Sequence, residues 1–235
     1  MIQALRSFIF FVWLYTMLPV WGLLFMPWAI VDVRGGWAAV RSFSWLMRYS
    51  AWFMVGIKTE TRGTPPQGEV IIASKHQSFL DIFMITSMVP RPKFIMKSSL
   101  IWAPVLGFYG WRIGCIPVKR GRRSEAIRKM LDQAKNGKNY HGQLIIFPQG
   151  TRVPMGEKMP YKVGAFALYT QLEQTVVPVA ANVGHVWPKA GIMKYPGTAT
   201  IEFLPPIEQG VDQEDFMERL ADVIETGSDA LHAET

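Results

Sequence analysis

The longest apolar stretch of the chain runs from residue 7 to residue 31, 25 positions without one charged side chain. As a single helix it would reach about 37 Å, more than the ~30 Å hydrocarbon core of a bilayer. It is too long for the core of a signal peptide and lacks a small-x-small cleavage site before Asp32, so we expect it to be retained. Pro19, Gly22 and Pro27 are expected to kink or break the helix.

A second aromatic-rich run covers residues 43–57 and carries Arg48 in its middle. This pattern suits an interfacial helix whose arginine snorkels to the membrane surface. Two membrane arrangements stay open: the first run spans once, or both runs form a helical pair seated in one leaflet. A buried core helix is a third interpretation, although soluble cores rarely show so long an uncharged run.

Basic residues follow the first apolar run, and the positive-inside rule therefore predicts that the remainder of the chain lies on the cytoplasmic side. They are Arg34, Arg41, Arg48, Lys58 and Arg62.

Beyond residue 56, short apolar strands alternate with helical runs, which predicts an α/β domain with a mixed, partly parallel sheet flanked by helices. The expected strands are 57–62, 69–74, 93–96, 114–118, 143–147, 176–182 and 198–204. The expected helices are 79–89, 99–111, 124–136, 162–173 and 213–226. We therefore divide the chain into an N-terminal membrane-embedded helical segment (1–56), an α/β domain (57–226) and a frayed C-terminal tail (227–235).

Candidate chemistry lies where the strand ending at Ser74 turns into a helix. His76 and Asp81 are five residues apart there. Within one helix they would stand about 140° apart, but across a strand-to-helix turn they can meet. An imidazole whose Nδ1–H is held by a carboxylate can take a proton from a hydroxyl group at Nε2. Ser78 and Asp81 also fit a capping box, a purely structural interpretation.

The distribution of charge along the chain adds a further indication of function. The formal net charge is +7, and residues 91–129 hold ten Lys or Arg against one acid, Glu125. Such a cluster suits anionic lipid head groups or a phosphate pocket. Nucleic acid is a third possibility, but we do not expect it as a partner because no recognition motif accompanies the charge and the N-terminus is strongly apolar. The single cysteine, Cys115, rules out an internal disulfide and a cysteine-based metal site.

Two further segments read as strands that end in polar loops. Residues 114–120 end in Lys119 and Arg120, and the apolar strand within residues 143–152 delivers a loop that contains Gly150 and Arg152. Ligands bind at strand ends in α/β sheets. Glycine lets backbone N–H groups approach an anion, and arginine can form two parallel hydrogen bonds with phosphate oxygens.

Together these segments resemble the four blocks of the glycerolipid acyltransferase family, bacterial type, over roughly residues 55 to 207. The blocks appear in order as His76-x4-Asp81, residues 114–120, residues 147–152 and residues 177–179. The resemblance implies acyl transfer from acyl carrier protein or coenzyme A to the sn-2 hydroxyl of 1-acyl-glycerol-3-phosphate at the bacterial inner membrane. It also implies no metal, no cofactor and no covalent acyl-enzyme.

The resemblance further assigns residue roles. His76 is the expected general base, and Asp81 is its orienting partner. The residues expected to bind the substrate phosphate are Lys97, Lys119, Arg120, Gly150, Thr151 and Arg152. Gln149 and Pro178 are expected to contact substrate, Pro178 as part of an acyl-binding wall.

Two positions depart from the family pattern: Lys75 replaces the usual asparagine, and Gln149 replaces a glutamate. The uncharged amide at 149 raises a lyso-ornithine lipid as an alternative acyl acceptor. A thioesterase-like hydrolase and a non-catalytic lipid-binding protein stay open as well. The hydrolase would generally need a nucleophile, but the chain contains no Gly-x-Ser-x-Gly motif, and Cys115 lies in an apolar strand.

Overall fold

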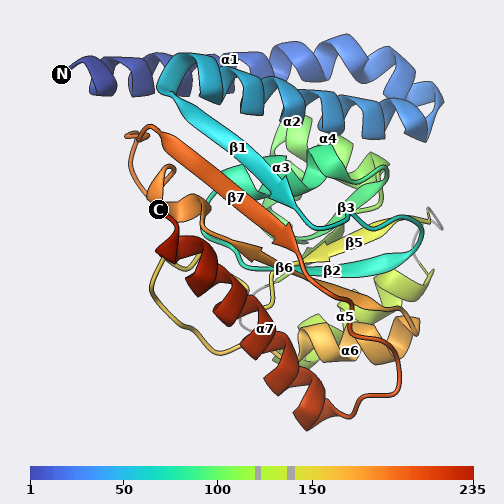
Figure 1. Cartoon of the computed structure of the whole chain (residues 1–235). Coiled ribbons are helices and arrows are strands. Elements are labelled where there is room, and N and C mark those ends of the chain that lie inside the picture. Colours follow the sequence, from blue (N-terminus) through green and yellow to red (C-terminus); the bar gives the residue numbers. More distant parts are fainter. Residues whose placement is uncertain (120–122, 137–140) are drawn as a thin grey trace.

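The computed structural model describes residues 1–119, 123–136 and 141–235. Across these residues, seven strands form one sheet in the order β1-β7-β6-β2-β5-β3-β4 (Figure 1). Every neighbouring pair is parallel except β6 and β7, so the expected mixed sheet is confirmed. The strands are β1 (Ile57–Arg62), β2 (Val70–Ser74), β3 (Pro92–Lys97), β4 (Ile116–Val118), β5 (Gln143–Ile146), β6 (Val176–Ala181) and β7 (Gly197–Phe203).

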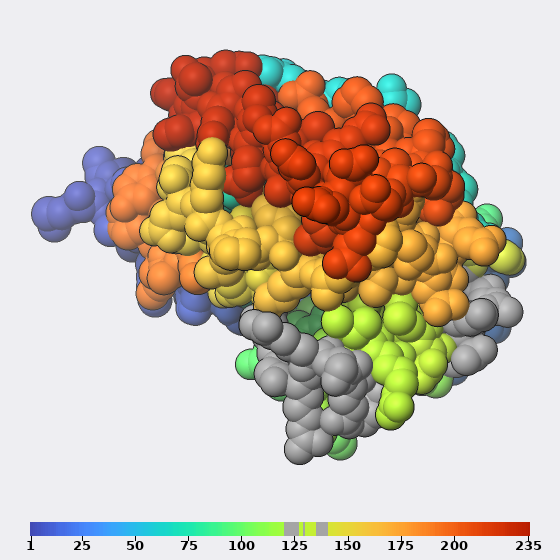
Figure 2. Space-filling model, turned by 90° about the horizontal axis from the view of Figure 1, so that it is seen from below, coloured from blue at the N-terminus to red at the C-terminus, as the bar shows by residue number. Residues whose placement is uncertain are grey.

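Helices cover both faces of this sheet, as Figure 1 shows. The helices are α1 (Ile2–Val31), α2 (Val33–Val55), α3 (Leu80–Met88), α4 (Pro104–Arg112), α5 (Arg123–Asn136), α6 (Gly164–Leu172) and α7 (Gln213–Ala233), with short 3-10 turns η1 (Ser98–Trp102) and η2 (Val183–His185). Seen from below, the surface opposite α1 and α2 consists mainly of α7 and of residues near α6, and little of α1 beyond its N-terminal end is visible (Figure 2).

The central strands explain this layering because their side chains alternate between two cores. Ile72 and Ile145 pack against α2 and α3, whereas Ile71 and Leu144 pack against α5, α6 and α7. All six residues of β6 are buried, as expected for a strand that is covered on both faces.

The break that was one of the two expectations for the first helix is absent, because α1 continues through Pro19, Gly22 and Pro27. Each proline removes one helical hydrogen bond. However, α2 packs along α1, and two cross-links fix the pair: the Nε1–H groups of Trp13 and Trp21 donate to Ser50 and Ser42 on α2. Packing of α2 against α1 therefore compensates for the helical hydrogen bonds that the prolines remove.

Arg48 was expected to snorkel to a membrane surface, and this is wrong. The residue is 6% exposed. Its Nε donates to Thr59 Oγ1 at 3.0 Å and its Nη1 to Ser87 Oγ at 2.7 Å. The reason is that Arg48 lies on the side of α2 that packs against α3 and β1.

One expected helix, 99–111, is divided in two. The residue before a proline disfavours helical geometry, and Ala103 is extended immediately before Pro104. The chain therefore forms η1, breaks, and restarts as α4.

The expected frayed tail from residue 227 is also wrong, because α7 continues to Ala233. Buried positions recur along α7 at a helical spacing and include Leu231. The Leu231 carbonyl accepts a hydrogen bond from Asn182 Nδ2 at 2.8 Å, and Arg62 binds the Glu234 carboxylate through two nitrogens. The last turns are thus part of the domain.

Replacing Leu231 with alanine tests this packing. Loss of a buried leucine side chain should lower the free energy of unfolding by about 3 kcal/mol. Denaturant unfolding in detergent micelles measures the change. His232→Ala, at the exposed neighbouring position, is the control and should stay within about 0.5 kcal/mol of the unaltered protein. An equal decrease in the free energy of unfolding in both variants would contradict the packing of the end of α7 against the domain.

Candidate active site

Five mutually parallel strands, β2 to β6, bring the candidate residues together. Their carboxyl ends lie at one edge of the sheet, where ligands bind in α/β proteins. His76 follows β2, Lys97 ends β3, Lys119 follows β4, and residues 147–152 follow β5. Segments that are far apart in sequence therefore meet at one place.

His76 and Asp81 form a hydrogen-bonded pair at this edge. The Nδ1 atom of His76 lies 3.0 and 3.1 Å from the two carboxylate oxygens of Asp81. Oδ2 of Asp81 also accepts the backbone N–H groups of Gln77 and Ser78, at 2.8 and 2.9 Å. A carboxylate acceptor keeps the imidazole proton on Nδ1 and leaves Nε2 as a proton acceptor.

The capping interpretation of this turn is compatible with the His76–Asp81 pair. Ser78 Oγ accepts the N–H of Leu80 at 3.0 Å while Asp81 binds back to the N–H of Ser78. The same carboxylate thus closes the first turn of α3 and holds the imidazole. Asp81 is fully buried, and these donors satisfy its charge.

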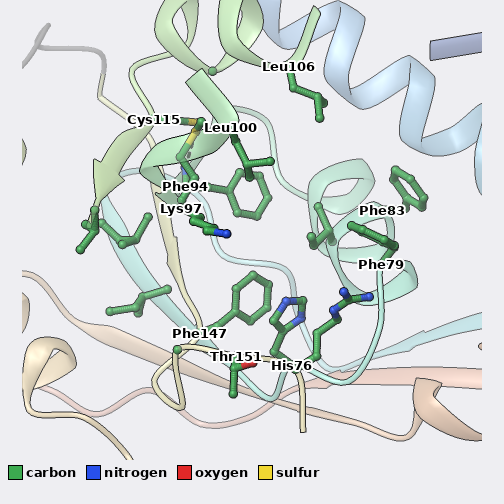
Figure 3. Close-up of a pocket in the computed structure, with 18 of the residues that line it drawn as sticks. His76, Phe79, Phe83, Phe94, Lys97, Leu100, Leu106, Cys115, Phe147 and Thr151 are labelled. Atoms are coloured by element: carbon green, nitrogen blue, oxygen red, sulfur yellow. Dashed lines mark hydrogen bonds between the residues drawn. The ribbon is translucent and has the colours of Figure 1, made fainter. Parts of the chain in front are cut away.

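The imidazole is supported from its other side by the loop after β5. The Phe147 ring stacks on His76 with centroids 3.9 Å apart and planes 20° apart (Figure 3). The N–H of Val153 donates to the His76 carbonyl at 2.7 Å. Together these contacts leave the His76 side chain only 12% exposed.

His76 lines a cavity of about 1500 Å³. Its apolar walls come from α1, α2, α3 and α4 and include Phe10, Phe43, Phe79 and Val105. Cations line it as well: Lys97, Lys119, Arg152, Lys162, Lys189 and Lys194. In Figure 3, Lys97 points toward the space beside His76 and Phe147. Hydrocarbon and anion can therefore both be accommodated next to one imidazole.

The loop after β5 has the geometry of an anion-binding loop. Gly150 has a φ of 69°, in the region that favours glycine. Thr151 and Arg152 follow it and line the same cavity. The guanidinium of Arg152 lies 4.5 Å above the Phe79 ring and donates to the Lys189 carbonyl at 2.9 Å. Arg152 is thus held beside the cavity.

Lys162 is a cation that the sequence-based reasoning missed. Its ammonium group occupies the space where a side chain on residue 150 would begin. Its backbone N–H bonds the Pro148 carbonyl at 3.0 Å, which fixes it beside the loop. The sequence pattern marks residue 162 only as the start of a helix. The available signal was a lysine that follows the Gly150 loop closely in sequence.

Three comparisons bear on what this site is. The family model described as Acyltransferase matches residues 56–182. The chain belongs to the acyltransferase family.

Curated relatives agree with this assignment, and one solved structure has the same fold. The 1-acyl-sn-glycerol-3-phosphate acyltransferase of Pseudomonas aeruginosa is 31% identical over 213 residues, 87% of this chain and 81% of that protein. The protein of the same name from Limnanthes alba is 26% identical over 95% of this chain and 82% of its own length. A crystal structure of the Thermotoga maritima 1-acyl-sn-glycerophosphate acyltransferase superposes with a TM-score of 0.80, at 19% identity, and covers 98% of this chain and 99% of that one.

Not every predicted site residue of this acyltransferase reaches the cavity. Pro178 is buried within β6, between β2 and β7, and does not line the cavity. It was expected to form an acyl-binding wall, but its position in a doubly covered strand keeps it from the site. Arg120 lies outside the described residues.

Of the two residues that depart from the family pattern of this acyltransferase, Gln149 lines the cavity and Lys75 does not. Gln149 is 1% exposed, and its Nε2 donates to Glu225 of α7 at 3.3 Å. Lys75 also binds Glu225, with Nζ 2.6 Å from Oε2. Glu225 lies outside all four sequence blocks, so the sequence alone could not single it out.

Cys115 of the acyltransferase is unsuited to act as a nucleophile. Burial raises the pKa of its thiol to about 12, so almost none is ionised near neutral pH. Its sulfur accepts the N–H of Phe94 at 3.3 Å. Only the thiolate form of cysteine is a strong nucleophile.

This raised pKa predicts how Cys115 reacts. Alkylation by a thiol reagent should quicken about tenfold per pH unit from about pH 8 to pH 10, because the thiolate fraction is still rising there. Mass spectrometry of the labelled peptide measures the rate. Cys115→Ala should keep acyl transfer within about twofold of the unaltered enzyme. A labelling plateau near pH 9, or loss of activity in the variant, would contradict this assignment.

Proposed function

We propose that this acyltransferase moves a fatty acyl group from a thioester to the sn-2 hydroxyl of 1-acyl-glycerol-3-phosphate and makes phosphatidic acid. His76 is the general base and Asp81 its orienting partner. The observation that carries the proposal is the Asp81-held imidazole beside a cavity with apolar walls and several cations. The names of the relatives support this acceptor.

The proposed reaction is a direct transfer. Nε2 of His76 takes the hydroxyl proton while the hydroxyl oxygen attacks the thioester carbonyl carbon. The tetrahedral intermediate then collapses, the carbon–sulfur bond breaks, and the imidazolium proton goes to the leaving thiolate. General base catalysis contributes about 10²–10⁴-fold, and positioning of the two substrates adds to it. No metal, cofactor or covalent intermediate enters this proposal.

The phosphate of the acceptor would bind among the cations at the strand ends. Lys97, Lys119 and Arg152 line the cavity together with Gly150 and Thr151. Arginine can bind a phosphate through two nitrogens, and lysine contributes a compact charge. Lys162, which lies against Gly150, joins this group. By family resemblance, Arg120 would also contribute.

The size of the cavity supports a lipid substrate. At about 1500 Å³ it exceeds the ~300–1,000 Å³ of ordinary small-molecule sites. Its walls include Phe10 and Leu14 of α1 and Phe43 of α2, so hydrocarbon chains could enter from a bilayer that these helices contact. The thioester carrier, acyl carrier protein or coenzyme A, stays outside this apolar space in the proposal.

We further propose that α1 and α2 lie in one leaflet of the bacterial inner membrane, with the α/β domain on the cytoplasmic face. By length and composition α1 is apolar enough to cross a membrane. Its outer side exposes large apolar residues such as Leu23 and Leu24, and α2 exposes Phe53. An exposed apolar face of this size is typical of a membrane contact.

Contacts at both ends of α1 favour the one-leaflet arrangement over a single span. Near its start, Gln3 Nε2 donates to the Lys194 carbonyl at 2.8 Å. Near its end, Tyr109 Oη donates to the Gly22 carbonyl at 2.6 Å and Arg112 Nε to the Ala29 carbonyl at 2.5 Å. A helix joined to the domain at both ends cannot cross the bilayer while the domain stays in water.

His76→Ala tests the reaction. Acyl transfer to 1-acyl-glycerol-3-phosphate should fall about 10²–10⁴-fold because the general base is lost. The assay uses purified enzyme with acyl carrier protein and coenzyme A thioesters, and a parallel acceptor arm with lyso-ornithine lipid. His141→Ala, an exposed histidine on another loop, is the control and should keep its activity. Faster transfer to lyso-ornithine lipid in the unaltered enzyme would replace the proposed acceptor, and full activity of His76→Ala would refute the mechanism.

Single cysteines at positions 2 and 34, in a Cys115→Ala background, test the membrane arrangement. If α1 and α2 lie in one leaflet, both ends of α1 face the same side. A membrane-impermeant thiol reagent should then label both cysteines in inside-out vesicles and neither in right-side-out vesicles. Labelling of the two positions from opposite sides would establish a single span instead.

A further inference from the structure

Three side chains from separate segments meet at Glu225 of α7. Lys75 Nζ lies 2.8 and 2.6 Å from the two oxygens of the carboxylate. Tyr161 Oη donates to Oε1 at 2.9 Å, and Gln149 Nε2 donates to the same oxygen at 3.3 Å. The Lys75 side chain is 3% exposed and that of Glu225 12%, so this cluster is shielded from water.

Each of these partners adjoins a residue of the candidate active site. Lys75 directly precedes His76, and Tyr161 directly precedes Lys162. Gln149 lies within the loop that begins with Phe147, whose ring stacks on the imidazole. One carboxylate on α7 therefore touches the segment that carries the proposed base and the loop that carries the proposed anion site.

The charges of the cluster are complementary. A lysine buried to this degree requires a nearby negative charge, and Glu225 supplies it. Gln149 is a neutral donor to that carboxylate. If the Gln149 amide were flipped, its oxygen would face the Glu225 carboxylate, and neither of these two acceptors could donate a hydrogen bond. Glu225 therefore also fixes the orientation of the amide. Burial, and then the Glu225 charge, raise the pKa of Tyr161, which keeps the phenol a proton donor.

A glutamate at position 149, as the pattern of the third block has it, would not fit beside Glu225. The two carboxylates would approach to roughly the separation of the present hydrogen bond, where two negative charges repel each other strongly. The side chains at 75, 149 and 225 are therefore interdependent: one lysine, one amide and one carboxylate.

We propose that Glu225 is a positioning residue of the active site, which supplies from α7 the carboxylate that position 149 lacks. With Lys75 as its counter-ion, it holds the segment bearing His76 against the loop bearing Gly150 and Arg152. This inference rests on the proposed function, because the positioned groups are those proposed to bind and activate the acyl acceptor.

The Gln149→Glu variant provides the first test. The added negative charge displaces the loop from Glu225 and moves Arg152 with it. KM for 1-acyl-glycerol-3-phosphate should rise about tenfold, as for loss of one good hydrogen bond, while KM for the thioester stays unchanged. A merely structural defect reduces the fraction of folded enzyme, which lowers the measured kcat and changes neither KM.

The second test is rescue in Gln149→Glu/Glu225→Gln. Lys75 and Gln149 bond the same carboxylate oxygen, so a carboxylate at 149 lies close enough to pair with Lys75 after a small rotation. The double variant again holds one lysine and one carboxylate. Its KM for the phosphate-bearing acceptor should return to within about threefold of the unaltered enzyme.

Glu218→Gln is the matched control. Glu218 lies on the same helix, seven residues before Glu225, and is exposed. Gln149→Glu/Glu218→Gln has the same net charge as the rescue variant and should stay as impaired as Gln149→Glu. An unchanged KM in Gln149→Glu would overturn the proposal. So would rescue by both Glu225→Gln and Glu218→Gln, or rescue by neither of them.

Stability separates this proposal from the proposed function. Glu225→Gln alone leaves a buried ammonium without its counter-ion, and the melting temperature should drop by about 10 °C, whereas the rescue double variant should lie within about 3 °C of the unaltered protein. If the unaltered enzyme does not acylate lysophosphatidate, the proposed acceptor is wrong. The melting temperatures of Gln149→Glu, Glu225→Gln and the double variant then still test the inference. A melting temperature of the double variant near that of the unaltered protein supports the carboxylate exchange. A decrease equal to the sum of the two single decreases overturns it.

Discussion

The carboxylate of Asp81 joins the fold to the chemistry. It closes the turn between β2 and α3 by accepting two backbone N–H groups, and the same oxygens hold the Nδ1 side of His76. A buried carboxylate is tolerated only when such donors surround it. The geometry that makes α3 start where it does is therefore also the geometry that orients the imidazole. The remaining candidate groups are arranged around this fixed point.

In the proposed function, membrane contact and substrate binding involve the same helix. Helix α1 exposes apolar side chains on its outer side, while Phe10 and Leu14 on its inner side line the cavity beside His76. A lipid chain that leaves the bilayer along such a helix would not need to cross water. Hydrogen bonds between the domain and both ends of α1 keep this wall in place.

Charge is distributed in two layers at the carboxyl ends of the strands. Cations such as Lys97 and Arg152 line the cavity, where an anionic head group could neutralise them. Behind them, Glu225 neutralises Lys75 and orients Gln149. Because a second carboxylate would disturb this inner layer, the departures of Lys75 and Gln149 from the family pattern belong together with a residue on α7.

The sequence by itself determined the alternation of strands and helices, the segments that end in polar loops and the spacing of His76 and Asp81, because these depend on residues that are near in the chain. Tertiary structure alone decided that α1 stays unbroken, that Arg48 is buried and that the last residues are helical. It also excluded Pro178 from the cavity and brought Lys162 and Glu225 to the site. These outcomes depend on strand order and helix packing, which join residues as far as 172 positions apart and leave no local pattern.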